Sequence, residues 1–146
     1  MNDFPHLYRV KVEGKTKGNL TAHAERLPDI EVAPPIQFGG PGDQWSPEDL
    51  LMASIANCLV LSFRAIARAS KLEWDSIECE SVGELDKVER KAQFTSVISK
   101  VNLFIPANEN KEKAERLLIK AEETCLISNS LSCESRIECE VIFGGE

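Results

Sequence analysis

The chain has 146 residues, enough for one domain with a substantial core, and its 42% hydrophobic and 28% charged residues are typical of a soluble globular protein. Its formal net charge of −7 argues against nucleic acid as a partner, because phosphates require a cationic binding surface. Five cysteines without paired spacing argue against an extracellular disulfide framework and favour a reducing compartment. We therefore predict one cytoplasmic domain over residues 1–146.

Neither the longest apolar run nor the N-terminal segment has the pattern of a membrane-inserted sequence. The most apolar run, residues 50–63, stops at Arg64 and is shorter than a membrane span requires. Residues 1–6 lack the basic start and apolar stretch of a signal peptide. These features predict no membrane partner.

The first part of the chain predicts strands and a long loop. Tyr8, Val10 and Val12 alternate with charged residues, the period of a half-buried strand. Residues 20–24 alternate again after turn-forming residues, so we predict a hairpin, with brief pairing at residues 30–32. Residues 28–47 are rich in proline and glycine, and a loop of this length in a small domain is usually functional.

A central helix is predicted to begin at Ser46-Pro47. Ser46 suits the N-cap, Pro47 suits the first helical position, and Glu48 and Asp49 suit the positive end of the helix dipole. Further along, Ser54, Cys58 and Ser62 recur every four residues on an otherwise apolar helix that we expect to end near residues 70–71. This stripe must face another helix, a symmetry mate or a pocket.

The second half of the chain predicts a hairpin, a helix and a closing strand. Two strands are expected over residues 76–88 and 94–105, joined by a charged turn at residues 89–91. Residues 110–125 have the pattern of an amphipathic helix, and residues 136–143 alternate as a strand. The predicted fold class is α+β, with antiparallel sheet wrapped around a long central helix.

Two cysteines on predicted helices are candidates for chemistry. Cys58 and Cys125 could be core packing, the commoner fate of a free cysteine, or a dithiol that attacks an oxidant and resolves as a disulfide. Cys58 lies roughly 18 Å from the start of its helix, beyond the reach of the dipole, so its ionisation requires a cation or hydrogen-bond donor from elsewhere. Cys125 follows a negative helix end, which favours Cys58 as the attacker and Cys125 as the resolving thiol.

The other cysteines and the two histidines give weaker support for a catalytic or metal-binding role. Cys79 and Cys139 lie on predicted strands and are assigned to packing, whereas Cys133 lies in a loop and could exchange with Cys125. His6 and His23 are far from any pair of cysteines, and no Cys-x-x-Cys or His-x-x-x-His spacing occurs. We therefore predict neither a metal site nor a bound cofactor.

Two motifs resemble those of the OsmC/Ohr family, the osmotically inducible protein C and organic hydroperoxide resistance proteins. The first is FGGPGDQWSPEDLL at residues 38–51 running into ANCL at residues 56–59, in which Glu48 and Cys58 keep the ten-residue spacing of the family's helix start and Ala-x-Cys. The second is CLISNSL at residues 125–131, similar to the family's Cys-Pro-Val-Ser-Asn-Ala-Leu. The order of the predicted elements also agrees, so the resemblance covers nearly the whole chain.

The resemblance implies an intertwined homodimer with two thiol-dependent peroxidase sites at its interface. Cys58 would attack organic hydroperoxides, Cys125 would resolve the product as a disulfide, and a small or lipoyl-type dithiol would reduce it. Glu48 would hold an activating arginine, which relatives carry before the central helix. Here that region offers Lys15, Lys17 and Gln37, and Arg26 is the candidate for the activating cation. The alternative is a non-catalytic or weakly active module that binds an apolar ligand in the dimer pocket.

Overall fold

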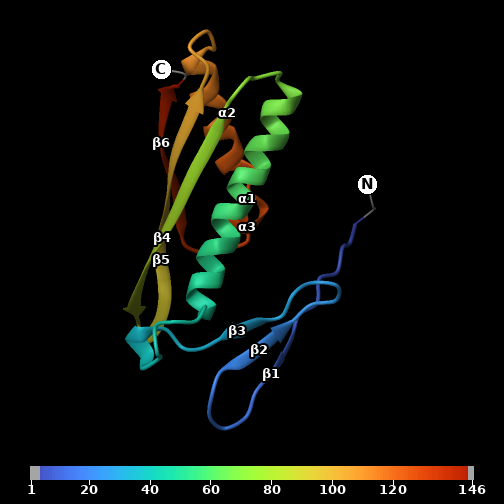
Figure 1. Cartoon of the computed structure of the whole chain (residues 1–146). Helices are drawn as coiled ribbons and strands as arrows, with labels where there is room; N and C mark the ends of the chain where they lie inside the picture. The colour runs from blue at the N-terminus through green and yellow to red at the C-terminus, as the bar shows by residue number, and fades with distance from the viewer. Residues whose placement is uncertain (1–3, 145–146) are drawn as a thin grey trace. The chain divides into compact units, whose positions relative to one another are not determined.

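The computed structural model describes residues 4–144 and has the predicted α+β class, with two sheets and a long helix (Figure 1). It divides into two compact units, residues 1–51 and residues 52–146, which are described separately here. Residues 1–3 of the segment tested for a signal peptide lie outside the described residues.

The N-terminal unit is built on a three-stranded antiparallel meander. Its strands are β1 (Lys11–Glu13), β2 (Leu20–His23) and β3 (Ile30–Val32), in the order β1-β2-β3. The strand predicted from Tyr8 begins later, and the three residues of β1 are exposed rather than half-buried, so their alternation does not mark a core face. The long loop after β3 contains a short 3-10 helix, η1 (Ile36–Phe38), that the proline and glycine pattern concealed.

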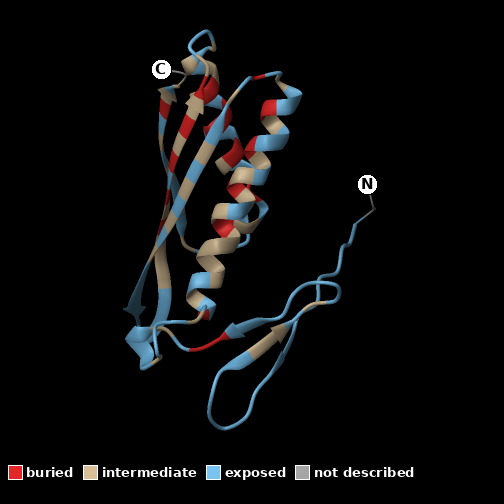
Figure 2. Ribbon diagram, viewed as in Figure 1, coloured by how far each residue is buried: buried red, intermediate tan, exposed pale blue. Residues whose placement is uncertain are grey.

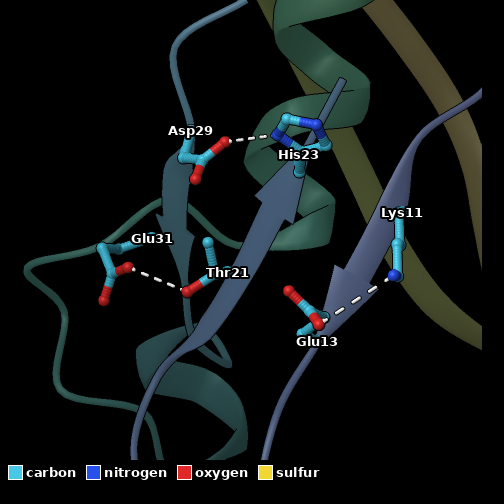
Figure 3. A network of polar contacts seen from close by, with 6 residues as sticks. All are labelled: Lys11, Glu13, Thr21, His23, Asp29 and Glu31. Atoms are coloured by element: carbon cyan, nitrogen blue, oxygen red, sulfur yellow. Dashed lines mark hydrogen bonds and ion pairs between the residues drawn. The ribbon is translucent and has the colours of Figure 1, made fainter. Parts of the chain in front are cut away.

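Polar side chains link the strands of this meander (Figure 3). Thr21 Oγ1 on β2 donates to Glu31 Oε2 on β3 across 3.1 Å, and His23 Nδ1 lies 2.7 Å from Asp29 Oδ1. All of these contacts are exposed to solvent, where such pairs add little stability.

Helix α1 (Pro47–Ala69) begins where the capping residues predicted. Ser46 is fully buried, and its Oγ accepts the backbone N–H of Asp49 at 3.1 Å and lies 2.9 Å from Asp49 Oδ2, a reciprocal cap. The helix ends with Lys71 in the left-handed region at φ 58, and the Leu72 N–H returns 2.9 Å to the Ala67 carbonyl. The sequence therefore located both ends of α1 to within about a residue.

The expectation that the apolar helix is too short for a membrane is wrong on length. Among the described residues, one helix is long enough and apolar enough to cross a membrane by length and composition, and that helix is α1. The core helix of a soluble protein passes the same test, and α1 buries Ile55, Leu59, Phe63 and Ala67, residues spaced four apart on one face. This burial identifies α1 as a core helix.

The C-terminal unit contains a mixed sheet in the order β4-β5-β6. Strands β4 (Ser76–Val88) and β5 (Lys91–Ile105) form the predicted antiparallel hairpin, whose two turn residues, Glu89 and Arg90, both have positive φ. Strand β6 (Glu134–Phe143) pairs with β5 in parallel, so the prediction of a wholly antiparallel sheet is wrong. The reason is the intervening helical segment, which carries the chain back to the same end of the sheet.

Two helices make up that crossover. Helix α2 (Lys111–Glu123) begins at Asn110, whose side chain accepts the Lys113 N–H at 2.9 Å, and ends before the predicted Cys125. A second, four-residue helix, α3 (Leu126–Asn129), follows at once and was not predicted.

The core of this unit lies between the sheet and the helices α1 and α2, which cover the same face of it (Figures 1 and 2). The two helices, the central strand β5 and the edge strand β6 contribute buried apolar side chains, and Leu72 adds one after the end of α1. They are Leu59, Phe63, Ala67, Leu72, Val101, Leu103, Ile105, Ala114, Leu117, Leu118, Ala121 and Val141.

Candidate active site

Cys58 lies in the middle of α1, at the edge of the buried stripe. It directly precedes the fully buried Leu59, but its own side chain is only half-buried. Ser62, one turn further along the predicted stripe of small polar residues, donates its hydroxyl to the Cys58 sulfur. At Cys58 this stripe faces the segment around Cys125 in the same chain.

The start of helix α3 supplies further donors to Cys58, in addition to Ser62 of its own helix. The backbone N–H groups of Ile127 and Leu126 both hydrogen-bond to the Cys58 sulfur. The first N–H groups of a helix have no intrahelical acceptor, so they are available to a neighbouring group. The backbone of α3 thus provides hydrogen-bond donors from outside α1, as the sequence analysis required for the ionisation of Cys58.

Cys125 completes the set of donors around Cys58. It is fully buried at the N-cap position of α3, with extended backbone at φ −68 and ψ 110. Its thiol donates a hydrogen bond to Cys58. The structure therefore brings together the two cysteines that the sequence singled out.

The two thiols of this pair have opposite pKa shifts. Burial raises the pKa of the Cys58 thiol, but the hydrogen bonds that its sulfur accepts outweigh burial and hold this pKa below its ordinary value. Burial raises the pKa of Cys125, and the neighbouring Cys58 raises it further. Cys58 is therefore the thiol that ionises first, and Cys125 keeps the shared proton.

A polar cluster on the far side of Cys125 was not predicted from the sequence. The Ser128 hydroxyl hydrogen-bonds to the Cys125 sulfur, and its Oγ lies 3.4 Å from Ser135 Oγ on β6. Ser135 in turn donates to Glu122 Oε1 on α2 across 2.9 Å. The one sequence signal was a carboxylate three residues before Cys125, on the face of α2 that includes the buried Ala121 and Leu118.

The two other predicted site residues belong to the N-terminal unit. Glu48 lies in the first turn of α1, half-buried, and its Oε1 has no hydrogen-bond partner among the described residues. Arg26 is exposed in the turn between β2 and β3, with a positive φ of 68. Their participation in the site stays a prediction.

The remaining thiols lie outside the pair. All five cysteines are free. Cys79 and Cys139 pack against the core, and burial raises the pKa of each, Cys79 also facing Glu122 and Cys139 facing Glu115. Cys133 is half-buried directly before β6. Among residues 4–144, no group of three or more His, Cys, Asp or Glu side chains is arranged to hold a metal ion.

Comparison with known proteins finds a matching family model and a related bacterial sequence. Residues 40–140 match the family model described as OsmC-like protein. The uncharacterized protein YmaD of Bacillus subtilis is 26% identical over 117 residues, covering 77% of this chain and 78% of that protein. The matched family region contains Cys58 and Cys125 together with the elements that hold them.

Solved structures share the fold. An OsmC-like protein of unknown function from Vibrio cholerae superposes with a TM-score of 0.86 at 19% identity, over 93% of this chain and 100% of that one. An organic hydroperoxide resistance protein OsmC from Legionella pneumophila superposes with a TM-score of 0.74 at 24% identity, over 96% and 99% of the two chains. At these identities the likeness establishes the fold.

Proposed function

The chain belongs to the OsmC-like protein family, and from this premise we propose that it is a thiol-dependent peroxidase that reduces organic hydroperoxides to alcohols. The observation that carries the proposal is the environment of Cys58. Its sulfur accepts hydrogen bonds from two backbone N–H groups of α3, from the Ser62 hydroxyl and from the Cys125 thiol. Such donors favour a thiolate, and the thiolate is the form of cysteine that attacks a peroxide.

The reaction proceeds in two steps at this pair. The Cys58 thiolate attacks one peroxide oxygen, the O–O bond breaks, and the alkoxide leaves and takes a proton to become the alcohol; sulfur is oxidised to a sulfenic acid as the peroxide is reduced. The Cys125 sulfur then attacks Cys58, forming the disulfide and releasing water. An external dithiol, of lipoyl or small-molecule type, becomes a disulfide itself as it returns both cysteines to thiols.

Exposed apolar side chains beside the pair support an organic substrate. Leu61, one turn after Cys58 on α1, is 57% exposed, and Leu126, whose N–H binds Cys58, is 66% exposed. Apolar surface of this kind favours an alkyl or aryl hydroperoxide over hydrogen peroxide, because only the organic substrate buries it.

The proposal includes a cytoplasmic homodimer, as the family resemblance implies. Glu48 and Arg26 keep their predicted roles, a carboxylate that orients a cation and the candidate for that cation. The backbone donors at Cys58 supply part of what the missing arginine would supply. An Arg26→Ala protein whose Cys58 reacts at the wild-type rate would remove Arg26 from the site.

Stoichiometric oxidation tests the proposal. Cumene hydroperoxide is added to the reduced protein, and peptide mass spectrometry identifies which cysteines have changed. The expected product is a Cys58–Cys125 disulfide, with Cys133→Ser as a control that leaves this product intact. If Cys58 remains a free thiol under conditions that oxidise exposed control thiols, the chain is instead a non-catalytic module.

A further inference from the structure

The second step of the proposed reaction requires the thiol proton of Cys125 to be removed before its sulfur attacks. Cys125 must lose its thiol proton to attack the oxidised Cys58, but Cys125 is fully buried and its pKa is raised by burial. Once Cys58 is oxidised, it is no longer the thiolate that accepts the hydrogen bond from Cys125. A proton acceptor must therefore be reached inside the protein.

A line of hydroxyl groups leads from Cys125 to a carboxylate. The Ser128 hydroxyl donates to the Cys125 sulfur, and Ser135 Oγ donates to Ser128 Oγ at 3.4 Å and to Glu122 Oε1 at 2.9 Å, so the relay requires the Ser128 hydroxyl to turn from Cys125 toward Ser135. A serine hydroxyl both donates and accepts, so each can pass a proton onward by accepting one and donating its own. The three side chains come from α2, α3 and β6, which are packed together in one unit.

The carboxyl group of Glu122 has the properties of a proton acceptor. Its Oε2 is buried and has no hydrogen-bond partner among the described residues, and neither ion pair found in residues 4–144 includes Glu122. The groups that face it are Ser135 on β6 and Cys79 on β4. Burial raises the pKa of Glu122, which makes its carboxylate a stronger base than an exposed glutamate.

We propose that Glu122 accepts the proton of Cys125 through the hydroxyls of Ser135 and Ser128 when Cys125 attacks oxidised Cys58. The inference rests on the proposed function and assigns Glu122 as a positioning residue for its resolving step. As the S–S bond forms, the Cys125 proton moves to Ser128, the Ser128 proton to Ser135 and the Ser135 proton to Glu122. The leaving group departs from Cys58 as an anion, which is hydroxide in the peroxidase reaction, and the proton that Glu122 gives back to solvent balances the water formed from it.

The attack of Cys125 can be measured without a peroxide. Dithiobis(nitrobenzoate), an aromatic disulfide, reacts with the Cys58 thiolate to give a mixed disulfide and one nitrothiobenzoate. Cys125 then attacks the Cys58 sulfur, forms the Cys58–Cys125 disulfide and expels a second nitrothiobenzoate. Acid quenching and peptide mass spectrometry follow the adduct and the disulfide separately from the other three cysteines.

The informative variants are Glu122→Gln and Ser135→Ala. We expect each to slow conversion of the adduct into the disulfide by about 100-fold, the size of a typical proton-transfer contribution, and to leave formation of the adduct unchanged. Glu123→Gln is the matched control, because Glu123 is the exposed neighbour on α2. Ser135→Thr should restore conversion to within about threefold of wild type, since threonine keeps the hydroxyl.

The outcomes distinguish failure of the proton relay from failure of the proposed peroxidase function. Conversion at the wild-type rate in both Glu122→Gln and Ser135→Ala would overturn the relay alone, as would equal slowing by Glu123→Gln. If Glu122→Gln fails to fold, the Ser135→Ala and Ser135→Thr pair decides the question. A wild-type protein that forms no adduct at Cys58 would overturn the proposed function and the relay together.

Discussion

Cys125 donates its thiol proton to the sulfur of Cys58, and this hydrogen bond adds to the backbone donors at Cys58 and to the burial of Cys125 in shifting the two thiol pKa values in opposite directions. The pKa of Cys58 lies below the ordinary thiol value, and that of Cys125, raised first by burial, lies above it. The contacts between α1 and α3 thus favour Cys58 as the attacking thiol and Cys125 as the resolving thiol. Each of the following predictions tests one part of that geometry.

Replacing Cys58 and replacing Cys125 should change the reaction with peroxide in different ways. Cys58→Ser removes the attacking sulfur and should abolish hydroperoxide consumption. Cys125→Ser should allow one attack and then leave Cys58 as a sulfenic acid that excess peroxide oxidises to sulfinic acid. Peroxide consumption and intact-protein mass report both results. Equal, wild-type consumption by the Cys58→Ser protein would contradict the assignment.

Ser62 should contribute measurably to the ionisation of Cys58. Ser62→Ala removes one donor to the sulfur, and loss of a hydrogen bond to a charged group should raise the midpoint of Cys58 alkylation by about one pH unit. Ser70→Ala, just beyond the end of α1, is the control and should leave the midpoint unchanged. A Ser62→Ala midpoint equal to that of wild type would show that the backbone donors suffice.

The buried side chains of α2 should contribute more to the free energy of unfolding than its exposed side chains. Leu118 is fully buried, whereas its neighbour Ile119 is 47% exposed. Leu118→Ala should lower the free energy of unfolding by about 2–5 kcal/mol, and Ile119→Ala should lower it by less than about 1 kcal/mol. Urea denaturation followed by circular dichroism measures both. Similar losses in the two variants would contradict the placement of the core.

The buried carboxyl of Glu122 should give stability a specific pH dependence. Burial raises the folded-state pKa of Glu122, so its contribution to stability is fully present below the unfolded pKa and is lost as pH rises through the folded pKa. Glutamine does not titrate. The stability of Glu122→Gln relative to wild type should therefore increase as pH rises from about 4 upward. A difference that is constant with pH, or that decreases, would contradict this account; Glu123→Gln is the control.

The sequence predicted the elements whose signals are local and chemical. The cap at Ser46 and the apolar run over residues 50–63 located α1, and the charged turn at residues 89–91 located the end of β4. The parallel pairing of β6 with β5 was missed because period-two alternation is the same in parallel and antiparallel strands. Helix α3 was missed because four residues are too few to show a helical period.

The site was predictable in its thiols but not in what activates them. Cys58 and Cys125 stood out by their place in two motifs, whereas the groups that donate to Cys58 include backbone N–H groups of Leu126 and Ile127. Every residue except proline carries such a group, so its involvement leaves no mark in the sequence. Glu122 was hidden for a related reason, because its neighbours Ser128 and Ser135 come from elements whose packing the sequence did not specify.

The pH dependence of Cys58 alkylation tests the central claim most directly. Iodoacetamide labelling, with each cysteine resolved by peptide mass spectrometry, gives the midpoint at which Cys58 becomes reactive. The hydrogen bonds from α3, Ser62 and Cys125 predict a midpoint clearly below the ordinary thiol value of about 8.5, with Cys125 unreactive over the same range. A midpoint at or above about 8.5 would contradict the claim that this chain holds Cys58 as a thiolate.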